Sequence, residues 1–329
     1  MKLISCFSDL REIDPLIDAG ADELYCAVEG IPHFGPGCLP SLRHLEKAVR
    51  RVHARRRRIS LAANAINHII LDVRDCRRLL RNLLAADRIG VDALIIASPT
   101  LLHMLQEFGR PLRAERHLSS VQPVFNRKTL EFFLPFGLSR LILPNQLSPL
   151  EADGLLELCR DSSISTELFD YRFFGCVYVN GRCDLHNPNF HTFRSDEDGG
   201  ALCRIGPGAR SLDALRPFNV LPARSNEVPA LGRRLALRMG CGGPARLATA
   251  ATFFDFLLRG VDYLKYGTRP DPARTKVWKV REARRMIARA ETLLKAHGAA
   301  GPLRRPGSPP AQAAREEFVE HMSGWGRRS

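Results

Sequence analysis

The feature that most constrains the fold is a repeated alternation of short apolar segments with longer amphipathic ones. Residues 90–97 form a short apolar run, and residues 73–87 carry leucines that recur on one side of a helix. Units of this kind return about every 25 residues, which is typical of a parallel α/β sheet. About eight strands fit between residues 2 and 267, so we predict an α/β fold, a TIM-type (βα)-barrel-like domain.

A doubly wound open sheet is the alternative for such an alternation. That class binds dinucleotides through a Gly-x-Gly-x-x-Gly turn directly after its first strand. The first predicted strand, residues 2–5, is not followed by this motif. We therefore favour the barrel, in which the loops after the strands share one face and carry the chemistry.

Capping signals place three helices along the barrel. Ser41 is a suitable N-cap for a helix that runs to about residue 57, and Pro99 suits the first turn of another. Ser148 and Glu151 have the spacing of a capping box, which predicts a helix to about residue 160. These signals agree with the periodicity and strengthen the α/β interpretation.

We divide the chain into three parts. Residues 1–275 are expected to form the barrel-like domain, including an irregular cysteine-rich insertion. Residues 276–298 are expected to form an amphipathic C-terminal helix packed on the barrel. Residues 299–329 are rich in Pro, Gly and Arg, and we expect a linker and a flexible tail, with a short helix at the end as the alternative.

Composition is that of an ordinary globular protein. Hydrophobic residues make up 45% of the 329 residues and charged residues 26%, so a sizeable core is available. No apolar run reaches transmembrane length, and the N-terminus lacks the apolar stretch of a signal peptide, so we expect a cytoplasmic protein. Nine cysteines, an odd number, do not indicate a secreted disulfide framework.

The chain is strongly basic, with a formal net charge of +14. Such a balance favours anionic partners: nucleic acid, an anionic membrane surface or an anionic substrate. The densest basic run, residues 51–58, ends a predicted helix, where cations are favourable and usually solvated. Nucleic-acid binding by this run is the alternative interpretation.

Four cysteines lie in glycine-rich, irregular surroundings. They are Cys176, Cys183, Cys203 and Cys241. Thiolates suit either zinc or an iron–sulfur cluster, and the tight Cys-x2-Cys pairs of zinc ribbons are missing. The loose spacing fits a four-iron cluster better, while zinc and simple burial stay open as alternatives.

A family resemblance appears at two of these cysteines. Cys176-x4-Gly181-x-Cys183, preceded by Glu167-x-Phe169, resembles the signature of the collagenase-like peptidase family, the "U thirty-two" peptidases. The resemblance covers roughly residues 1–280. The four-cysteine set is similar to the one that holds a [4Fe–4S] cluster in members that support oxygen-independent hydroxylation. The resemblance therefore implies such a cluster, and hydroxylation of a ubiquinone precursor or an RNA base.

The resemblance also suggests site residues on the loops after the strands. Glu167 of the signature and Gln122 of the segment Ser-Val-Gln-Pro-Val-Phe-Asn are the candidate catalytic residues. Asn126 is a candidate for substrate binding, with N-cap duty as its alternative. Lys265 and Arg269 match a family segment and are suited to an anionic, prephenate-like oxygen donor, with an ion pair to a neighbouring acid as the alternative.

Two departures weaken the catalytic interpretation. Asn145 and Gln146 stand where the family has an Arg–Glu pair, and the family's Glu after Lys265 is missing. A non-catalytic, cluster-bearing subunit in a heterodimer with a related family member is therefore one alternative. A peptidase is another, although the chain has neither a His-Glu-x-x-His zinc site nor a Gly-x-Ser-x-Gly elbow.

Overall fold

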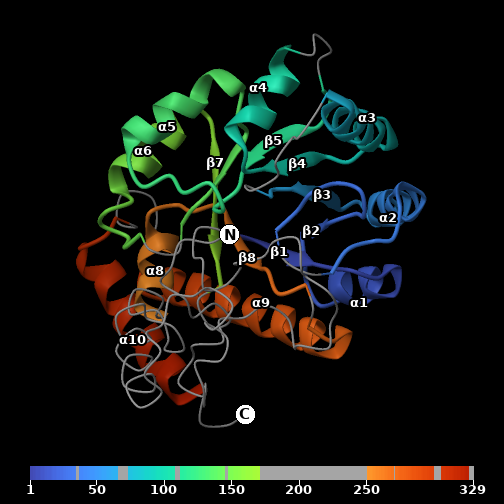
Figure 1. The fold of residues 1–329 in the computed structure, drawn as a ribbon. Helices are drawn as coiled ribbons and strands as arrows, with labels where there is room; N and C mark the ends of the chain where they lie inside the picture. The colour runs from blue at the N-terminus through green and yellow to red at the C-terminus, as the bar shows by residue number, and fades with distance from the viewer. Residues whose placement is uncertain are drawn as a thin grey trace, which may run out of the picture.

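A computed structural model describes residues 1–34, 37–65, 73–107, 112–144, 147–170, 250–269, 271–299 and 305–325. Its centre is a closed barrel of parallel strands with helices around it, which confirms the predicted fold class (Figure 1). The strands follow one another around the barrel in chain order. They are β1 (Lys2–Cys6), β2 (Glu23–Cys26), β3 (Arg58–Ala63), β4 (Ala93–Ile96), β5 (Glu115–Leu118), β6 (Arg140–Ile142), β7 (Ser165–Phe169) and β8 (Tyr263–Tyr266).

The barrel is closed by parallel pairing of β8 with both β7 and β1. Glu167 lies opposite Tyr263 in the β7–β8 pair, and Ile4 lies opposite Lys265 in the β1–β8 pair. Because every pair is parallel, the carboxyl ends of all eight strands meet at one mouth of the barrel. Residues of distant parts of the chain are thereby brought together at that mouth.

Helices cover the outside of the barrel. Their bounds are η1 (Leu10–Glu12), α1 (Ile13–Asp18), α2 (Leu42–Ala54), α3 (Val73–Ile89), α4 (Pro99–Glu107), α5 (Arg127–Phe133), η2 (Leu134–Phe136), α6 (Asp153–Asp161), α8 (Ala250–Leu258), α9 (Ala273–Ala296) and α10 (Pro309–Trp325). The Ser41 side chain accepts the His44 amide at the start of α2, as predicted. Ser148 and Glu151 exchange their capping-box hydrogen bonds in the turn that precedes α6.

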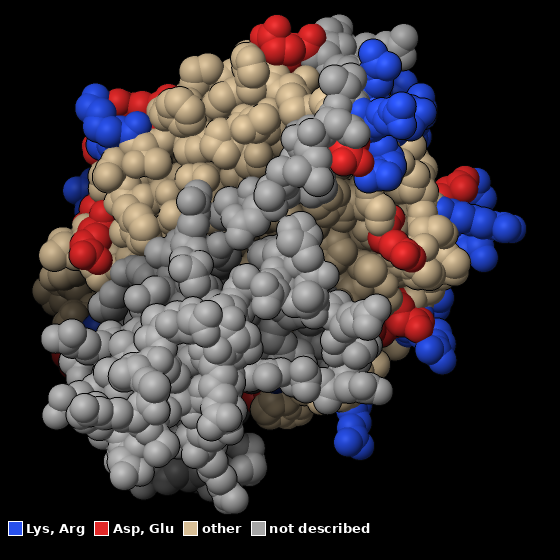
Figure 2. All heavy atoms as spheres, in the orientation of Figure 1, with Lys and Arg blue, Asp and Glu red and all other residues tan. Residues whose placement is uncertain are grey.

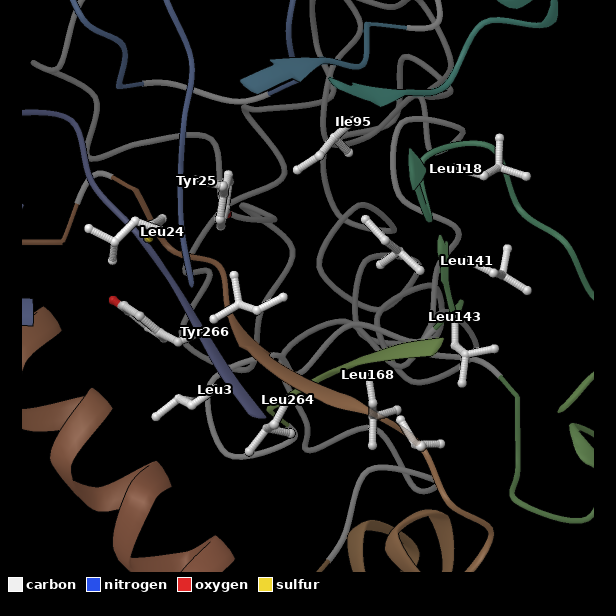
Figure 3. Packing of buried hydrophobic residues seen from close by; sticks show 14 of the residues in the cluster. Leu3, Leu24, Tyr25, Ile95, Leu118, Leu141, Leu143, Leu168, Leu264 and Tyr266 are labelled. Carbon is white, nitrogen blue, oxygen red and sulfur yellow. The ribbon is translucent and has the colours of Figure 1, made fainter. Parts of the chain in front are cut away.

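The hydrophobic core lies between the strands and the helices. Leu79, Leu80 and Leu83 of α3 are buried against the barrel, as the leucine periodicity predicts. Figure 3 shows part of the same cluster around the strands, with Leu3, Leu24 and other residues from different strands. This packing fixes the strands, so the side chains that point into the barrel are held rigidly.

The C-terminal segment differs from the expected linker and flexible tail. Residues 309–325 form α10, which packs on α8 and α9 (Figure 1). Phe318 is fully buried, and its ring centroid lies 5.1 Å from that of Phe254 and 5.7 Å from that of Phe253. Ala311, Ala314 and Phe318 share one helical face, so apolar burial outweighs the disorder that the Pro- and Gly-rich composition indicated. Elsewhere the division into three parts stays a prediction.

Within the described ranges, every helix falls short of the length or the hydropathy that a membrane-crossing segment needs.

Candidate functional site in the barrel interior

Charged side chains from four strands meet inside the barrel. They belong to Glu23 (β2), Arg140 (β6), Glu167 (β7) and Lys265 (β8), and each is no more than 4% exposed. Successive strand residues alternate between the interior of the barrel and the surrounding helices, and paired residues of parallel strands share a face. The apolar neighbours on these strands turn outward into the core, while the four charged residues turn inward.

Arg140 connects the two buried carboxylates. One of its terminal nitrogens donates to Glu23 Oε2 at 2.8 Å, and the other donates to Glu23 Oε1 at 3.0 Å and to Glu167 Oε2 at 3.1 Å. The Ser60 hydroxyl also donates to Glu23 Oε1, at 2.5 Å. The guanidinium lies over the ring of Tyr263, 3.7 Å from its centroid. This bidentate contact holds Glu23 and Arg140 in one fixed orientation.

Lys265 extends the network toward the mouth of the barrel. Its ammonium donates to Glu167 Oε1 at 2.8 Å, so Glu167 lies between Arg140 and Lys265. The ammonium also lies over the Tyr25 ring, 4.2 Å from the centroid. The candidate catalytic Glu167 and the candidate substrate-binding Lys265 are therefore in direct contact. We name Glu23, Arg140, Glu167 and Lys265 the interior network.

The network keeps the Glu167 carboxylate ionised. Burial on its own raises the pKa of Glu167, but the charges of Lys265 and Arg140 outweigh burial, so this pKa is lowered. Burial on its own lowers the pKa of Arg140, but Glu167 and Glu23 outweigh it, so this pKa is raised. The four charges thus form two cations and two anions, which balance in the dry interior.

His117 on β5 borders the network and is fully buried. Burial lowers its pKa, which favours the neutral imidazole at neutral pH. Its Nε2 lies 3.1 Å from Glu115 Oε2, so the neutral tautomer that donates from Nε2 fits this contact. Nδ1 has no hydrogen-bond partner among the described residues. His117 therefore offers an unused acceptor inside the barrel.

The loops after β2, β3 and β5 are tied together at the mouth. Asn64 accepts the Phe34 amide at 3.0 Å and donates to the Ser119 hydroxyl at 3.1 Å. The candidate Gln122 follows in the same loop, where its backbone N–H donates to the Ser119 carbonyl at 2.9 Å. Arg269 is buried and donates to the Phe34 carbonyl. Gln122 and Arg269 thus both lie at the mouth, where the sequence placed them.

Asn126 lies at the start of α5, on an exposed part of the mouth. Its side chain accepts the Thr129 amide at 2.9 Å and the Thr129 hydroxyl at 3.1 Å. This is the N-cap duty that was the alternative to substrate binding. The structure brings Glu167 and Lys265 into contact but places Asn126 in a local role outside that contact.

Gly267 allows the aromatic side chains to approach the mouth closely. A Cβ atom at this position would lie 2.8 Å from the Phe169 ring and 3.3 Å from the Tyr25 hydroxyl. The Tyr25 hydroxyl donates to the Gly267 carbonyl at 3.0 Å. Any larger residue would displace the aromatic rings beside Lys265, so glycine at this position is part of the site's construction.

Four thiols in the described residues are poor nucleophiles. Burial raises the pKa of Cys6 to about 11, and the pKa of Cys26 and of Cys159 to about 12. Burial also raises the pKa of Cys38 in the loop after β2. These four thiols are therefore protonated at neutral pH, and Cys6, Cys26 and Cys159 are small buried residues of the core.

The four candidate metal ligands lie outside the described residues. Cys176, Cys183, Cys203 and Cys241 all belong to residues 171–249, as do most of the signature positions. Asn145 and Gln146 are also outside the described part of the chain. Among the residues that are described, no group of three or more His, Cys, Asp or Glu side chains is arranged to hold a metal ion.

Sequence reasoning missed Glu23, Arg140 and His117. Glu23 and Arg140 each stand in an otherwise apolar strand, and a charge in a strand that is buried on both faces needs a partner. His117 stands in the polar strand Glu-Arg-His-Leu, which carries no such signal. Arg140, within Ser-Arg-Leu-Ile-Leu, carried that signal. No sequence signal identified the partner of Arg140, because Glu23 and Arg140 are 117 positions apart in the chain.

The chain is similar in sequence to known proteins. The chain is 25% identical over 205 residues to a protein of Methanocaldococcus jannaschii named as an uncharacterized protease, which covers 62% of this chain and 48% of that protein. It is 26% identical over 193 residues to tRNA hydroxylation protein P of Escherichia coli, which covers 56% of this chain and 39% of the relative. The chain thus spans less than half the length of these two relatives.

The chain is also similar to a solved structure and matches a protein family. A structure described as a U32 peptidase is 13% identical, with a TM-score of 0.47 over 82% of this chain and 94% of the other. Residues 8–203, more than half of the chain, match the family described as Peptidase family U32. This match includes six of the eight strands, β2 to β7, and the first three candidate cysteines. The chain therefore belongs to peptidase family U32.

Proposed function

We propose that this chain is a [4Fe–4S] protein that acts in oxygen-independent hydroxylation, with an RNA base as the acceptor. Cys176, Cys183, Cys203 and Cys241 are the proposed ligands, and the bound cluster would supply electron transfer. A ubiquinone precursor is the other acceptor that the family resemblance implies. RNA is preferred because the relative from Escherichia coli is named as a tRNA hydroxylation protein.

That relative is the observation that carries the proposal. Its similarity extends over 193 residues of this chain, although only 39% of the relative is covered. Two features of the described structure support the proposal. The signature residue Glu167 is buried at the centre of a fixed charge network. The proposed ligands begin six residues after Asp170, which directly follows β7 at the mouth of the barrel.

The interior network suits positioning better than proton transfer. Glu167 accepts hydrogen bonds from two cations, and these cations lower its pKa, so it is a weak base at neutral pH. A substrate anion that approached Lys265 would compete with Glu167 for the ammonium. We therefore propose that Lys265 and Glu167 maintain the shape of the barrel mouth. The oxygen donor or the hydroxylation acceptor would then bind to the loops above them.

Peptidase activity is the second candidate, because the family and one relative carry that name. A cysteine peptidase needs a thiolate beside a histidine. The thiols of Cys6, Cys26, Cys38 and Cys159 have raised pKa values. Burial also lowers the pKa of His33, near Cys38 in sequence, to about 4. A thiolate–imidazolium pair is thus disfavoured for these four thiols.

The first experiment measures iron and acid-labile sulfide per chain after anaerobic purification. We expect about four of each in the wild type, as a [4Fe–4S] cluster requires, and a loss of both in Cys203→Ala. Cys159→Ala is the matched control, because that thiol is buried in α6 and its removal should leave the iron content unchanged. A folded, iron-free wild type would contradict the cluster.

The second experiment separates the acceptors. RNA and quinones from cells that contain the wild type or Cys203→Ala are compared by mass spectrometry for hydroxylated products. A hydroxylated base that depends on Cys203 supports the proposal. A cysteine-dependent change in quinones alone would transfer the proposal to the ubiquinone precursor. Cleavage of peptides by iron-free protein would favour the peptidase instead.

A further inference from the structure

Helix α3 carries an exposed stripe of arginines. Arg74, Arg77, Arg78, Arg81 and Arg88 are all exposed. With 3.6 residues per turn, their directions fall within a sector of about 100° around the helix axis. The stripe is about 21 Å long from Arg74 to Arg88 at 1.5 Å per residue. We name these five residues the α3 arginine stripe.

The stripe is poorly neutralised. Asp75 pairs with Arg78, and Asp87 is buried, where it accepts the Ala114 amide. The other four arginines have no ion-pair or hydrogen-bond partner among the residues that the structure describes. Figure 2 shows Lys and Arg side chains gathered over this part of the molecule, at the upper right where Figure 1 places α3.

The basic run that the sequence singled out is different. Arg51 pairs with Asp14, and Arg55 pairs with both Asp14 and Asp18 of α1. Arg58 pairs with Glu115 at 2.7 Å. Residues 51–58 are therefore largely compensated by acids from neighbouring elements. Four arginines of α3 have no such partner among the described residues.

Helix α2 enlarges the basic surface. It packs beside α3 (Figure 1), and its exposed Arg43 and Lys47 have no ion-pair partner in the described part of the chain. Arg50 is paired with Glu46. A broad surface of this kind attracts a polyanion more strongly than a small anion, because several charges act on it together.

We propose that the α3 arginine stripe is the docking surface for the phosphate backbone of RNA. Arginine binds phosphate oxygens through two parallel hydrogen bonds, which suits a row of phosphates. An anionic membrane fits less well, since the apolar side of α3 is buried in the barrel through Leu79, Leu80 and Leu83. The described exposed hydrophobic residues, Phe125, Phe132, Leu150 and Trp278, are not on α2 or α3.

The stripe leads toward the candidate site. In a parallel barrel each helix runs antiparallel to the strand before it, so α3 begins at the mouth. Arg74, Arg77 and Arg81 belong to the half of α3 nearest that mouth. RNA bound along the stripe would therefore reach the loops above Glu167 and Lys265. Naming RNA as the polyanion rests on the proposed function; the position of the surface rests on the arginines alone.

The test measures binding of a fluorescent unmodified tRNA transcript to the full chain between 50 and 200 mM salt, concentrations at which phosphate contacts are salt-sensitive. Arg77→Gln/Arg81→Gln removes two charges from the stripe. Two lost phosphate contacts lower the salt slope by about 1.4 to 1.8 and weaken binding roughly 20-fold at about 0.15 M salt. Arg51→Gln/Arg55→Gln is the matched control: it removes the same net charge from paired positions, and we expect a change of less than about threefold.

Each outcome decides the proposal. A selective loss in the α3 variant supports it, provided that the variant keeps its iron content and thermal transition. Equal losses in both variants would mean a general effect of net charge, and no loss in either would place RNA elsewhere; both overturn it. A wild type that binds its cluster but only anionic phospholipid vesicles overturns the RNA surface and leaves the cluster proposal standing. Wild type that binds RNA through the stripe without iron supports the surface and contradicts the cluster.

Discussion

Arg140 inside the barrel and Arg51 on α2 make contacts of similar geometry in opposite environments. Arg140 donates to Glu23 at 2.8 Å, and Arg51 donates to Asp14 at 2.9 Å through Nε. The side chains of the interior pair are each 2% exposed, whereas those of the surface pair are 43% and 32% exposed. Water and salt weaken the surface pair, but in the interior each charge depends wholly on its partners. Distance alone therefore does not rank these two pairs.

The largest expected effect is the removal of Arg140. In Arg140→Met two carboxylates stay buried, and the Ser60 hydroxyl is the one hydrogen-bond partner that Glu23 keeps among the described residues. We expect the free energy of unfolding to fall by about 3–5 kcal/mol in urea denaturation. Arg51→Met is the matched control, with an expected loss of about 0–1 kcal/mol. Similar losses in the two variants would mean that the interior is not as dry as its burial indicates.

The next effect concerns the coupling of Glu167 to Lys265. A double-mutant cycle with Glu167→Gln and Lys265→Met should give an interaction free energy of about 0.5–3 kcal/mol, measured by urea denaturation. The same cycle with Asp18→Asn and Arg55→Met should give about 0.2–1 kcal/mol, because that pair is exposed. An interior coupling near zero would show that Arg140 alone holds Glu167.

The smallest effect is the pH dependence of the same carboxylate. The pKa of Glu167 is lower in the folded chain than its usual value of 4.5, so its ionised form stabilises the fold above about pH 4.5. This contribution is lost as the pH falls through the folded pKa. The stability gap between wild type and Glu167→Gln should therefore narrow between pH 7 and pH 3, in urea titrations at each pH. A gap that widens toward acid would contradict the lowered pKa.

A control accompanies the pH series. Glu46 is exposed and pairs with Arg50 on the same helix. Glu46→Gln should differ from the wild type by only about 0.3–0.5 kcal/mol at neutral pH. If it reproduced the pattern of Glu167→Gln, the pH effect would reflect net charge and not the interior network.

The barrel itself could be predicted because its signals are local. Apolar strands, leucine periodicity and the cap at Ser41 each depend on a few neighbouring residues. The sequence also placed Glu167 and Lys265 at the same mouth, although their direct contact was only the alternative for Lys265. Parallel topology is what brings these two residues together, since every strand ends on the same side.

The parts that escaped prediction depend on contacts between distant segments. The partner of Arg140 comes from β2, and that pairing follows from closure of the barrel and not from any motif. Helix α10 was only the alternative to a flexible tail, because the Pro- and Gly-rich composition outweighed the spacing of Ala311, Ala314 and Phe318. The α3 arginine stripe was overlooked because the count of basic residues favours run 51–58, whereas free charge depends on which acids lie nearby.

The pairing of β7 with β8 has a consequence for how this fold can vary. Strand β7 precedes residues 171–249 and strand β8 follows them, and the two strands are hydrogen-bonded neighbours. Their register pairs Glu167, Leu168 and Phe169 with Tyr263, Leu264 and Lys265. The entropy cost of joining two fixed points grows only by about 0.6 kcal/mol for each doubling of the connection. An inserted segment there can therefore lengthen, shorten or be exchanged for another at little cost to the barrel. The sequence between β7 and β8 can therefore change, and with it the chemistry that it carries, while the barrel keeps its fold.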